Sequence, residues 1–213
     1  MLPPPSVTDI GALSVTDNKE QVPRLTKNEG DARARLQRTA LELFRERGYD
    51  QTTAAEIAAR AGVTERTFFR HFADKREVLF DGEAKLRVAL TASIADAPAG
   101  LGPLDTLFRA FRSLQPMIED NRPFSKPRQE VISTTPALHE RELAKMAALA
   151  DALAVALKAR GVADLQAVLA ARTGMAAFVH ATISWLDDPK LGLGERLDLA
   201  YRGLKALLTE NDP

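Results

Sequence analysis

The chain has 213 residues, of which 45% are hydrophobic, enough to bury a sizeable core. It contains no cysteine, which excludes disulfides, thiolate metal ligands and cysteine nucleophiles. The longest apolar run is the six residues 152–157, and the first thirty residues lack a basic region followed by an apolar stretch. We therefore expect a cytoplasmic protein that neither spans nor binds a membrane.

Positive and negative residues are equal in number over the whole chain, but they are unevenly distributed along it. Lys and Arg number 29 and Asp and Glu number 29, so the net charge is zero. Residues 24–76, however, hold twelve Lys or Arg against eight Asp or Glu, an excess of four positive charges. Such a local excess is typical of a small nucleic-acid-binding unit on a neutral body, although a solvated helix surface produces it equally often.

The first helix is predicted to begin after a Pro-rich start. Residues 1–30 are rich in Pro, Thr, Asn and Asp and have no sustained hydrophobic period, which predicts a disordered extension. From Asp31 onwards apolar residues recur at helical spacing, and the pattern stops at Gly48. We expect one helix between these two residues.

Two short helices are predicted next. Thr53 and Glu56 form a capping-box pattern that opens the first of them, and Gly62 ends it. Thr64 is the expected N-cap of the second helix, which runs to about His71. Two short helices joined by a tight turn make a helix-turn-helix, whose second helix can lie in the major groove of DNA.

The remaining periodic segments are also helical, and no segment alternates as a strand does. Asp74 with Glu77 is the expected cap of a longer helix that runs towards Ser93. Further helices are predicted at residues 104–119, 123–133, 136–160, 164–186 and 194–210. We therefore expect an all-α fold of about nine helices, with a helix-turn-helix head over residues 31–76 and a helical body over residues 77–213.

The motif extends well beyond the bare helix-turn-helix. Its residues are Gly48, Tyr49, Thr52, Thr53, Glu56, Ile57, Ala58, Ala61, Gly62, Val63, Thr67, Phe68, Phe69, Arg70, His71, Phe72, Asp74 and Lys75. This arrangement, within residues 32–80, closely resembles the TetR family of bacterial transcriptional regulators. The resemblance implies a homodimeric repressor, or occasionally an activator, of a palindromic DNA operator. It also implies release from double-stranded DNA when a small-molecule effector enters the helical body.

The helix after the turn supplies the expected reading surface. Phe68 and Phe72, four residues apart, point into the head, which leaves five outward positions, Glu65, Arg66, Thr67, Phe69 and Arg70. Arg66 is the first candidate for a bidentate contact to guanine, and Arg70 can contact either a base or a phosphate. Phe69 stands where the family usually has tyrosine, so a hydroxyl that could reach a phosphate is absent.

Other residues of the head are expected to touch the DNA backbone. The resemblance implies phosphate contacts from Thr53, His71 and Lys75, and Thr64 is expected close to the DNA at the start of the reading helix. Each of them also has an ordinary alternative role as a helix cap or a surface residue.

The resemblance further implies an effector pocket between residues 104–160 and the penultimate helix. The expected lining consists of large side chains and two histidines, namely Phe108, Phe111, Met117, Phe124, His139, Met146, Phe178 and His180. Large apolar residues at helical spacing also suit an ordinary core, and a lone histidine is usually structural.

A dimer interface is predicted on the last two helices. Small residues recur on one face of the penultimate helix, at Ala170, Gly174, Ala177 and Ala181. An apolar stripe on the final helix contains Leu197, Leu204 and Leu208. Two such helices from each subunit would form a four-helix interface. The alternative is that both stripes face the core of their own subunit.

Two other classes of protein fit the sequence less well. An enzyme is disfavoured because the sequence contains no Gly-rich phosphate loop, nucleophile elbow or other catalytic motif. No cluster of His, Asp and Glu has metal-ligand spacing, so we expect neither a metal nor a cofactor. A nonspecific architectural DNA-binding protein would carry a larger positive excess and would not need a neutral helical body.

Overall fold

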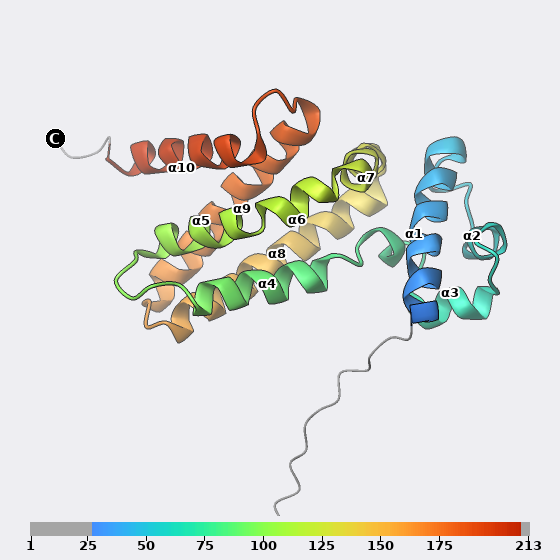
Figure 1. The fold of residues 1–213 in the computed structure, drawn as a ribbon, viewed down its shortest axis with the longest axis horizontal. Helices are drawn as coiled ribbons and strands as arrows, with labels where there is room; N and C mark the ends of the chain where they lie inside the picture. Colours follow the sequence, from blue (N-terminus) through green and yellow to red (C-terminus); the bar gives the residue numbers. More distant parts are fainter. Residues whose placement is uncertain (1–26, 210–213) are drawn as a thin grey trace, which may run out of the picture.

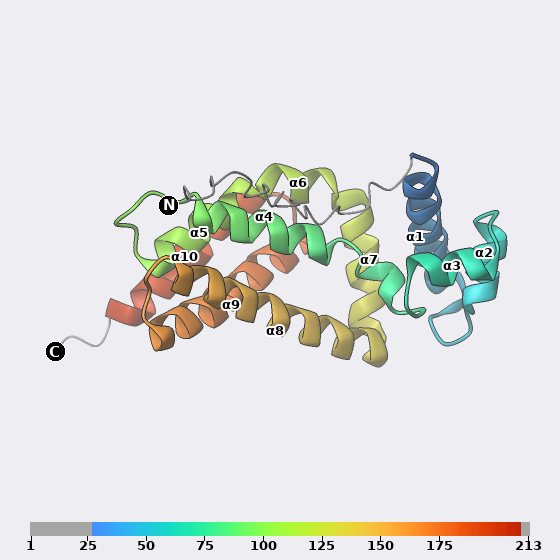
Figure 2. The ribbon, with the colours of Figure 1, turned by 90° about the horizontal axis from the view of Figure 1, so that it is seen from below.

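The computed structural model describes residues 27–209, and over this part of the chain it contains helices and no strand. Helices α1 to α3 form a head at one end of an elongated body built from α4 to α10 (Figures 1 and 2). The elements are α1 (Lys27–Arg47), α2 (Ala54–Arg60), α3 (Glu65–His71), the 3-10 turn η1 (Glu77–Leu79), α4 (Glu83–Ala95), α5 (Pro103–Ser113), α6 (Gln115–Asp120), α7 (Arg122–Thr134), α8 (Pro136–Ala159), α9 (Asp164–Asp187) and α10 (Leu193–Thr209).

The head follows the predicted pattern closely. Helix α1 begins at Lys27 rather than at Asp31, so residues 27–30 are helical, and the rest of the expected disordered extension lies outside the described residues. Thr53 and Glu56 form the predicted capping box of α2, and Thr64 caps α3. Gly62, with φ of +71°, supplies the left-handed residue that the turn between α2 and α3 requires.

The predicted long helix from Asp74 is wrong. The Asp74 carboxylate accepts hydrogen bonds from the amides of Arg76 (2.7 Å) and Glu77 (3.0 Å), but only the single turn η1 follows, and α4 begins at Glu83. Three consecutive apolar residues, 78–80, are all buried. All three pack into the head core, whereas α4 packs into the body core, so the chain bends between them. The chain between head and body is therefore a bent connector rather than a rigid helix.

The body also differs from the prediction at residues 104–119. This segment forms two helices, α5 and α6, that meet at Leu114. Pro116 has no amide hydrogen to donate to the carbonyl four residues earlier, which favours a break at this point. The predicted helices of the other body segments are present, within a few residues of the expected ends. Thr135 occupies the N-cap of α8, but its hydroxyl makes no cap hydrogen bond.

Two separate clusters of buried side chains stabilise the molecule. The larger one lies within the body, between α4, α5, α8, α9 and α10. The smaller one fills the head, but it also contains Val131 and Ile132 from α7 and Leu138 from α8. The head core is therefore completed by the corner between α7 and α8, and α7 packs against α1. Figure 2 shows α7 at the end of the body that faces the head.

Helix α9 is long and apolar enough to cross a membrane by length and composition alone. A core helix of a soluble protein passes the same test, and the inner side of α9 packs into the body core. One such helix is therefore weak support for a membrane span.

Candidate nucleic-acid interface

The exposed face of α3 carries four of the predicted reading residues. Glu65, Arg66 and Arg70 are exposed, and Phe69 is 51% exposed even though it is a large aromatic residue. Phe68, by contrast, is fully buried in the head core. In the part of the chain that the structure describes, no hydrogen bond or ion pair engages the guanidinium of Arg66 or Arg70. Two cations and a phenyl ring are thus presented to solvent on one short helix.

The start of α3 is held by its cap. The Thr64 hydroxyl accepts a hydrogen bond from the Thr67 amide (3.2 Å) and lies 3.0 Å from the Thr67 hydroxyl. Thr64 is exposed and Thr67 is half-buried, so both lie at the edge of the reading face. Their polar atoms already stabilise the first turn, which orients the face that follows.

The start of α2 is closed by the reciprocal hydrogen bonds of a capping box. The Thr53 hydroxyl accepts from the Glu56 amide (3.1 Å), and the Glu56 carboxylate accepts from the Thr53 amide (2.8 Å) and hydroxyl (2.9 Å). These hydrogen bonds from Thr53 lower the pKa of Glu56, because they favour its charged form. Thr53 is exposed beside the free amides of the first turn, a suitable place for a phosphate.

Lys75 is hydrogen-bonded within the head, and its expected phosphate contact stays a prediction. Its ammonium group donates to the carbonyl oxygens of Tyr49 (2.7 Å) and Thr52 (2.8 Å). It also lies 3.9 Å from the centroid of the Tyr49 ring. Burial lowers the pKa of Lys75, because the charged form loses hydration. The ammonium group therefore ties the connector to the turn between α1 and α2.

His71 is not on the reading face. Its side chain is buried and lines a cavity of about 220 Å³ where the head meets the body. The other lining residues are Arg33, Phe72, Ala73, Glu77, Asp81 and Arg141. The structure thus groups Glu65, Arg66, Phe69 and Arg70 on one surface, buries His71, and leaves Lys75 partly exposed beside the turn between α1 and α2.

A set of charged residues between head and body was not predicted. Arg141 of α8 donates to the Glu77 carboxylate of η1 at 2.7 Å, and Lys145 lies 3.1 Å from Glu77 and 2.8 Å from Glu83 of α4. Burial opposes the charge of Lys145, but hydrogen bonds to the two carboxylates outweigh it and raise its pKa. Arg128 of α7 donates to the Leu79 carbonyl at 2.6 Å. We call this set, Glu77, Glu83, Arg128, Arg141 and Lys145, the connector clamp.

The predicted effector pocket is not a single cavity. Phe108, Phe111 and Phe178 are buried together, and the rings of Phe111 and Phe178 stack with centroids 4.6 Å apart. The other predicted residues lie elsewhere. Met146 packs at the edge of the body core, Phe124 packs against the head core, and Met117, His139 and His180 are exposed. The structure thus brings together three of the eight residues, and the lining of an effector pocket stays a prediction.

The predicted dimer stripe faces the core of its own subunit. Ala170, Gly174 and Ala181 are buried, and a Cβ on Gly174 would lie 3.0 Å from Leu107 of α5. Leu197 is also fully buried. Ala177 and Leu204 are partly buried against the same core, and the side chain of Leu208 lies outside the described residues. The close approach that Gly174 permits is therefore to α5. The prediction is wrong for the buried residues Ala170, Gly174, Ala181 and Leu197, and it stays a prediction for Ala177 and Leu204, which are partly exposed.

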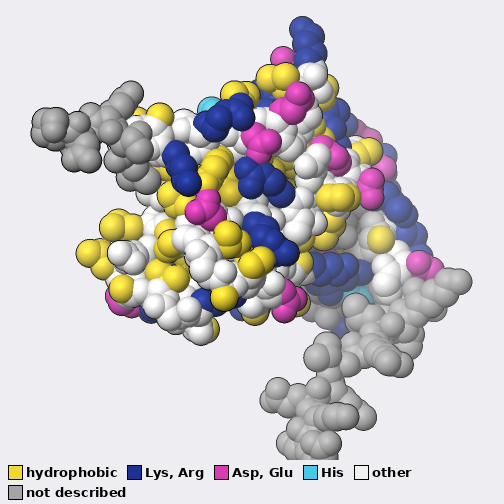
Figure 3. Space-filling model, turned by 60° about the vertical axis from the view of Figure 1, so that its left-hand side comes forward, with side chains coloured by type: hydrophobic (Ala, Val, Ile, Leu, Met, Phe, Trp, Pro, Cys, Tyr) yellow, Lys and Arg dark blue, Asp and Glu magenta, His cyan; other side chains and the backbone are white. Residues whose placement is uncertain are grey.

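Other apolar side chains of α9 and α10 are exposed instead. They are Leu165 (68% exposed) and Leu169 (55%) on α9 and Leu199 (49%) and Leu207 (67%) on α10. Figure 3, which brings forward the end of the body far from the head, shows apolar side chains exposed among Lys and Arg side chains. Within residues 27–209, no group of three His, Asp or Glu residues could hold a metal ion.

Known protein families match both the head and the body of the chain. The family described as "Bacterial regulatory proteins, tetR family" matches residues 36–81, and the family described as "MftR C-terminal domain" matches residues 101–209, about half of the chain. The HTH-type transcriptional regulator TcmR of Streptomyces glaucescens is 42% identical over 88 residues, which cover 41% of this chain and 39% of TcmR. The putative mycofactocin biosynthesis transcriptional regulator MftR of Mycobacterium tuberculosis is 26% identical over 165 residues, which cover 76% of this chain and 83% of MftR.

Solved structures share the fold. Thermus thermophilus FadR, a transcriptional repressor in complex with lauroyl-CoA, is 28% identical, with a TM-score of 0.55 over 85% of this chain and 97% of its own. NalD of Pseudomonas aeruginosa, the secondary repressor of a multidrug efflux pump, is 20% identical, with a TM-score of 0.57 over 84% of this chain and 98% of its own.

Proposed function

Since the chain belongs to the TetR family of bacterial transcriptional regulators, we propose that it is a homodimeric repressor of a palindromic operator. The observation that carries this proposal is the exposed face of α3, where Arg66 and Arg70 have no protein partner among the described residues. Arginine is the side chain best suited to bidentate contact with guanine in the major groove. In a dimer, two such helices about 34–36 Å apart would enter successive major grooves.

The exposed leucines of α9 and α10 favour a second copy of the chain as their partner. Leu165, Leu169, Leu199 and Leu207 are each about half exposed or more, and the two helices that carry them contact each other. An apolar surface of this kind is usually covered in the functional assembly. A two-fold axis through this surface would bring the helix pairs of two subunits together as a four-helix interface.

We propose that the effector acts on the head through the connector clamp. Arg141, Lys145 and Arg128 hold η1 and the start of α4, and the α7–α8 corner completes the head core. A shift of α7 or α8 in the body would therefore move the head. A ligand can shift this equilibrium only by binding one head position more tightly than the other.

The effector is proposed to be an apolar small molecule, such as an acyl compound, that enters the body near the aromatic cluster. The FadR structure holds lauroyl-CoA, and the body core of this chain contains closely packed phenyl rings. Trp185, the single tryptophan, is buried in the same core. Titration with lauroyl-CoA and with free laurate should therefore change its fluorescence, and no change with either compound would contradict an acyl effector.

The proposed function is tested by selecting duplexes from a random-sequence library with the full-length protein. We expect the selected sites to be palindromic and to bind far more tightly than random DNA of the same length. Transcription from a promoter that overlaps the selected site should fall when the protein is added. A protein that binds all duplexes alike would refute sequence-specific regulation, and increased transcription would identify an activator.

A further inference from the structure

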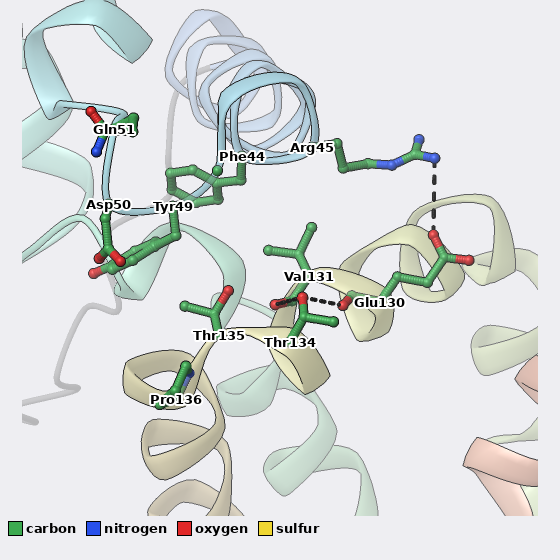
Figure 4. A pocket seen from close by; sticks show the side chains of 11 residues that line it. Phe44, Arg45, Tyr49, Asp50, Gln51, Glu130, Val131, Thr134, Thr135 and Pro136 are labelled. Carbon is green, nitrogen blue, oxygen red and sulfur yellow. Dashed lines mark hydrogen bonds and ion pairs between the residues drawn. The ribbon is translucent and has the colours of Figure 1, made fainter.

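Two aromatic pairs of the head pack edge-on, and they differ in how the outer ring is covered. In the first pair the rings of Phe44 and Tyr49 have centroids 5.2 Å apart, and the Lys75 ammonium group lies 3.9 Å from the centroid of the Tyr49 ring. Figure 4 shows this pair on the head side of a groove of about 530 Å³ that α7 and α8 close from the other side. In the second pair the rings of Phe68 and Phe69 have centroids 5.3 Å apart, and Phe69 is 51% exposed. The described part of the chain therefore covers the outer ring of the first pair and leaves half of the Phe69 side chain open.

Phe69 lies between two charged side chains on the exposed face of α3. Residues three and four apart are neighbours on a helix surface, so Phe69 has Arg66 on one side and Glu65 on the other. All three side chains are exposed, and within residues 27–209 no hydrogen bond or ion pair engages the Arg66 guanidinium. The fully buried Phe68 supports the Phe69 ring through the edge contact. An apolar ring and an arginine are therefore presented side by side to the same partner.

An exposed phenyl ring on a surface that reads DNA needs an apolar group to cover it. Base pairs present mostly hydrogen-bond donors and acceptors in the major groove, and the apolar group among them is the C5-methyl group of thymine. Phenylalanine has no hydroxyl, so its ring covers a methyl group without leaving a buried polar atom unpaired. In the same groove, guanine presents two acceptors to an arginine. The chemistry of the two side chains therefore matches a thymine and a guanine that lie close together.

We propose that Phe69 is a specificity-determining residue that packs against the C5-methyl group of a thymine, within two base pairs of the guanine that Arg66 contacts. The proposal rests on the proposed DNA-binding function and deepens it. The spacing follows from the helix, because Cβ atoms of residues three apart are about 5–6 Å apart and successive base pairs are about 3.4 Å apart. The Glu65 carboxylate beside the ring repels phosphates, which favours contact of this face with bases rather than with the DNA backbone.

The decisive measurement replaces the thymines of the selected duplex by deoxyuridine, one symmetric pair at a time. Deoxyuridine keeps the base pair and removes only the methyl group. Burial of one methyl group corresponds to about a fourfold gain in affinity, hence about fifteenfold for the two copies in a palindrome. We expect the wild-type protein to lose about this factor at a thymine pair near the guanine that Arg66 contacts. The proposal is overturned if no replacement weakens binding, or if every sensitive thymine lies more than two base pairs from the guanine at which Arg66→Ala relaxes the preference.

Variants of Phe69 show whether its ring makes this contact. In Phe69→Ala, duplexes with thymine and with deoxyuridine at the sensitive position should bind alike, because the methyl group has lost its partner. Phe69→Leu keeps an apolar side chain and should retain part of the difference between the two duplexes. Val88→Ala changes an exposed apolar residue of α4, outside the head, and should retain all of it. A difference that survives unchanged in Phe69→Ala would overturn the proposal, because another residue would then contact the methyl group.

The deoxyuridine measurement uses the unmodified protein, so it tests the proposal even if Phe69→Ala does not fold. Failure of the wild-type protein to prefer any duplex would refute the proposed function itself. A protein that prefers one palindrome but tolerates deoxyuridine at every thymine would refute only the contact of Phe69. The two failures are therefore distinguishable.

Discussion

The head and the body are both helical, but the contacts that determine them span very different distances along the sequence. The reading face of α3 depends on residues within one short segment, where Thr64 caps the helix and Phe68 anchors it. The body depends on distant partners, such as Leu107 against Gly174 and Glu77 against Arg141, which is 64 residues away. Local patterns therefore describe the surface that we propose to contact DNA, whereas packing between distant helices decides how that surface is held.

The head and the body share part of their cores, so the largest expected effect is that Ile132→Ala, a change in the body, destabilises the head. Ile132 belongs to α7 of the body but is fully buried in the head core. Its truncation should cost about 2–5 kcal/mol of the free energy of unfolding. Hydrogen exchange should show this loss of stability as faster exchange of the amides of α1 to α3. Leu149→Ala, in the body core, is the matched control and should deprotect α8 and α9 instead. Equal deprotection of both parts in both variants would mean that the molecule unfolds as one unit.

The second prediction concerns the exposed apolar faces. Leu169→Glu places a charge on the exposed side of α9, so it should give folded monomers in sedimentation experiments. Loss of the second half-site contact should weaken operator binding about a hundredfold or more. Leu143→Glu changes an equally exposed leucine on α8, outside the proposed interface, and should leave the dimer intact. A dimer that survives Leu169→Glu but not Leu143→Glu would move the interface to α8.

The residues that were predicted correctly share one property, namely that their partners lie within a few positions. The capping box of Thr53 and Glu56 and the left-handed Gly62 are examples, because backbone geometry alone dictates such residues. The connector could not be predicted, because its bend depends on what residues 78–80 pack against. The stripe containing Gly174 was misassigned for a similar reason. Small residues indicate close approach of a helix but do not say whether that helix belongs to the same subunit.

The third prediction tests the reading face itself. Arg66→Ala should weaken binding to the selected operator by roughly 1–3 kcal/mol and relax the preference at one symmetric base pair. The reason is that a bidentate arginine contact discriminates between bases, whereas a phosphate contact does not. Arg87→Ala removes an exposed arginine of α4, away from the head, and should leave both affinity and preference unchanged. Repeating the duplex selection with Arg66→Ala measures the effect, and an unaltered set of selected sites would refute the assignment of Arg66.

The smallest expected effect concerns the cap of α2, where stability depends on pH. Thr53→Ala removes the hydroxyl that accepts from the Glu56 amide, and loss of such a cap costs about 1 kcal/mol in typical proteins. Thr53→Ser keeps a hydroxyl and should retain most of the stability.

The pH dependence follows from Glu56. Hydrogen bonds from Thr53 lower the pKa of Glu56 below its ordinary value of 4.5, so the folded state binds the proton less readily than the unfolded state. The stabilisation is therefore fully present above pH 4.5 and is lost as the pH falls through the lowered pKa of the folded state. Thr53→Ala removes the hydroxyl bond but leaves the bond from the backbone amide, so it should reduce this acid dependence without abolishing it. Urea unfolding at neutral pH and at acid pH, followed by circular dichroism, measures both quantities. If Thr53→Ala and the wild-type protein lost the same stability on acidification, the hydroxyl of Thr53 would not contribute to the charge-dependent part of the cap.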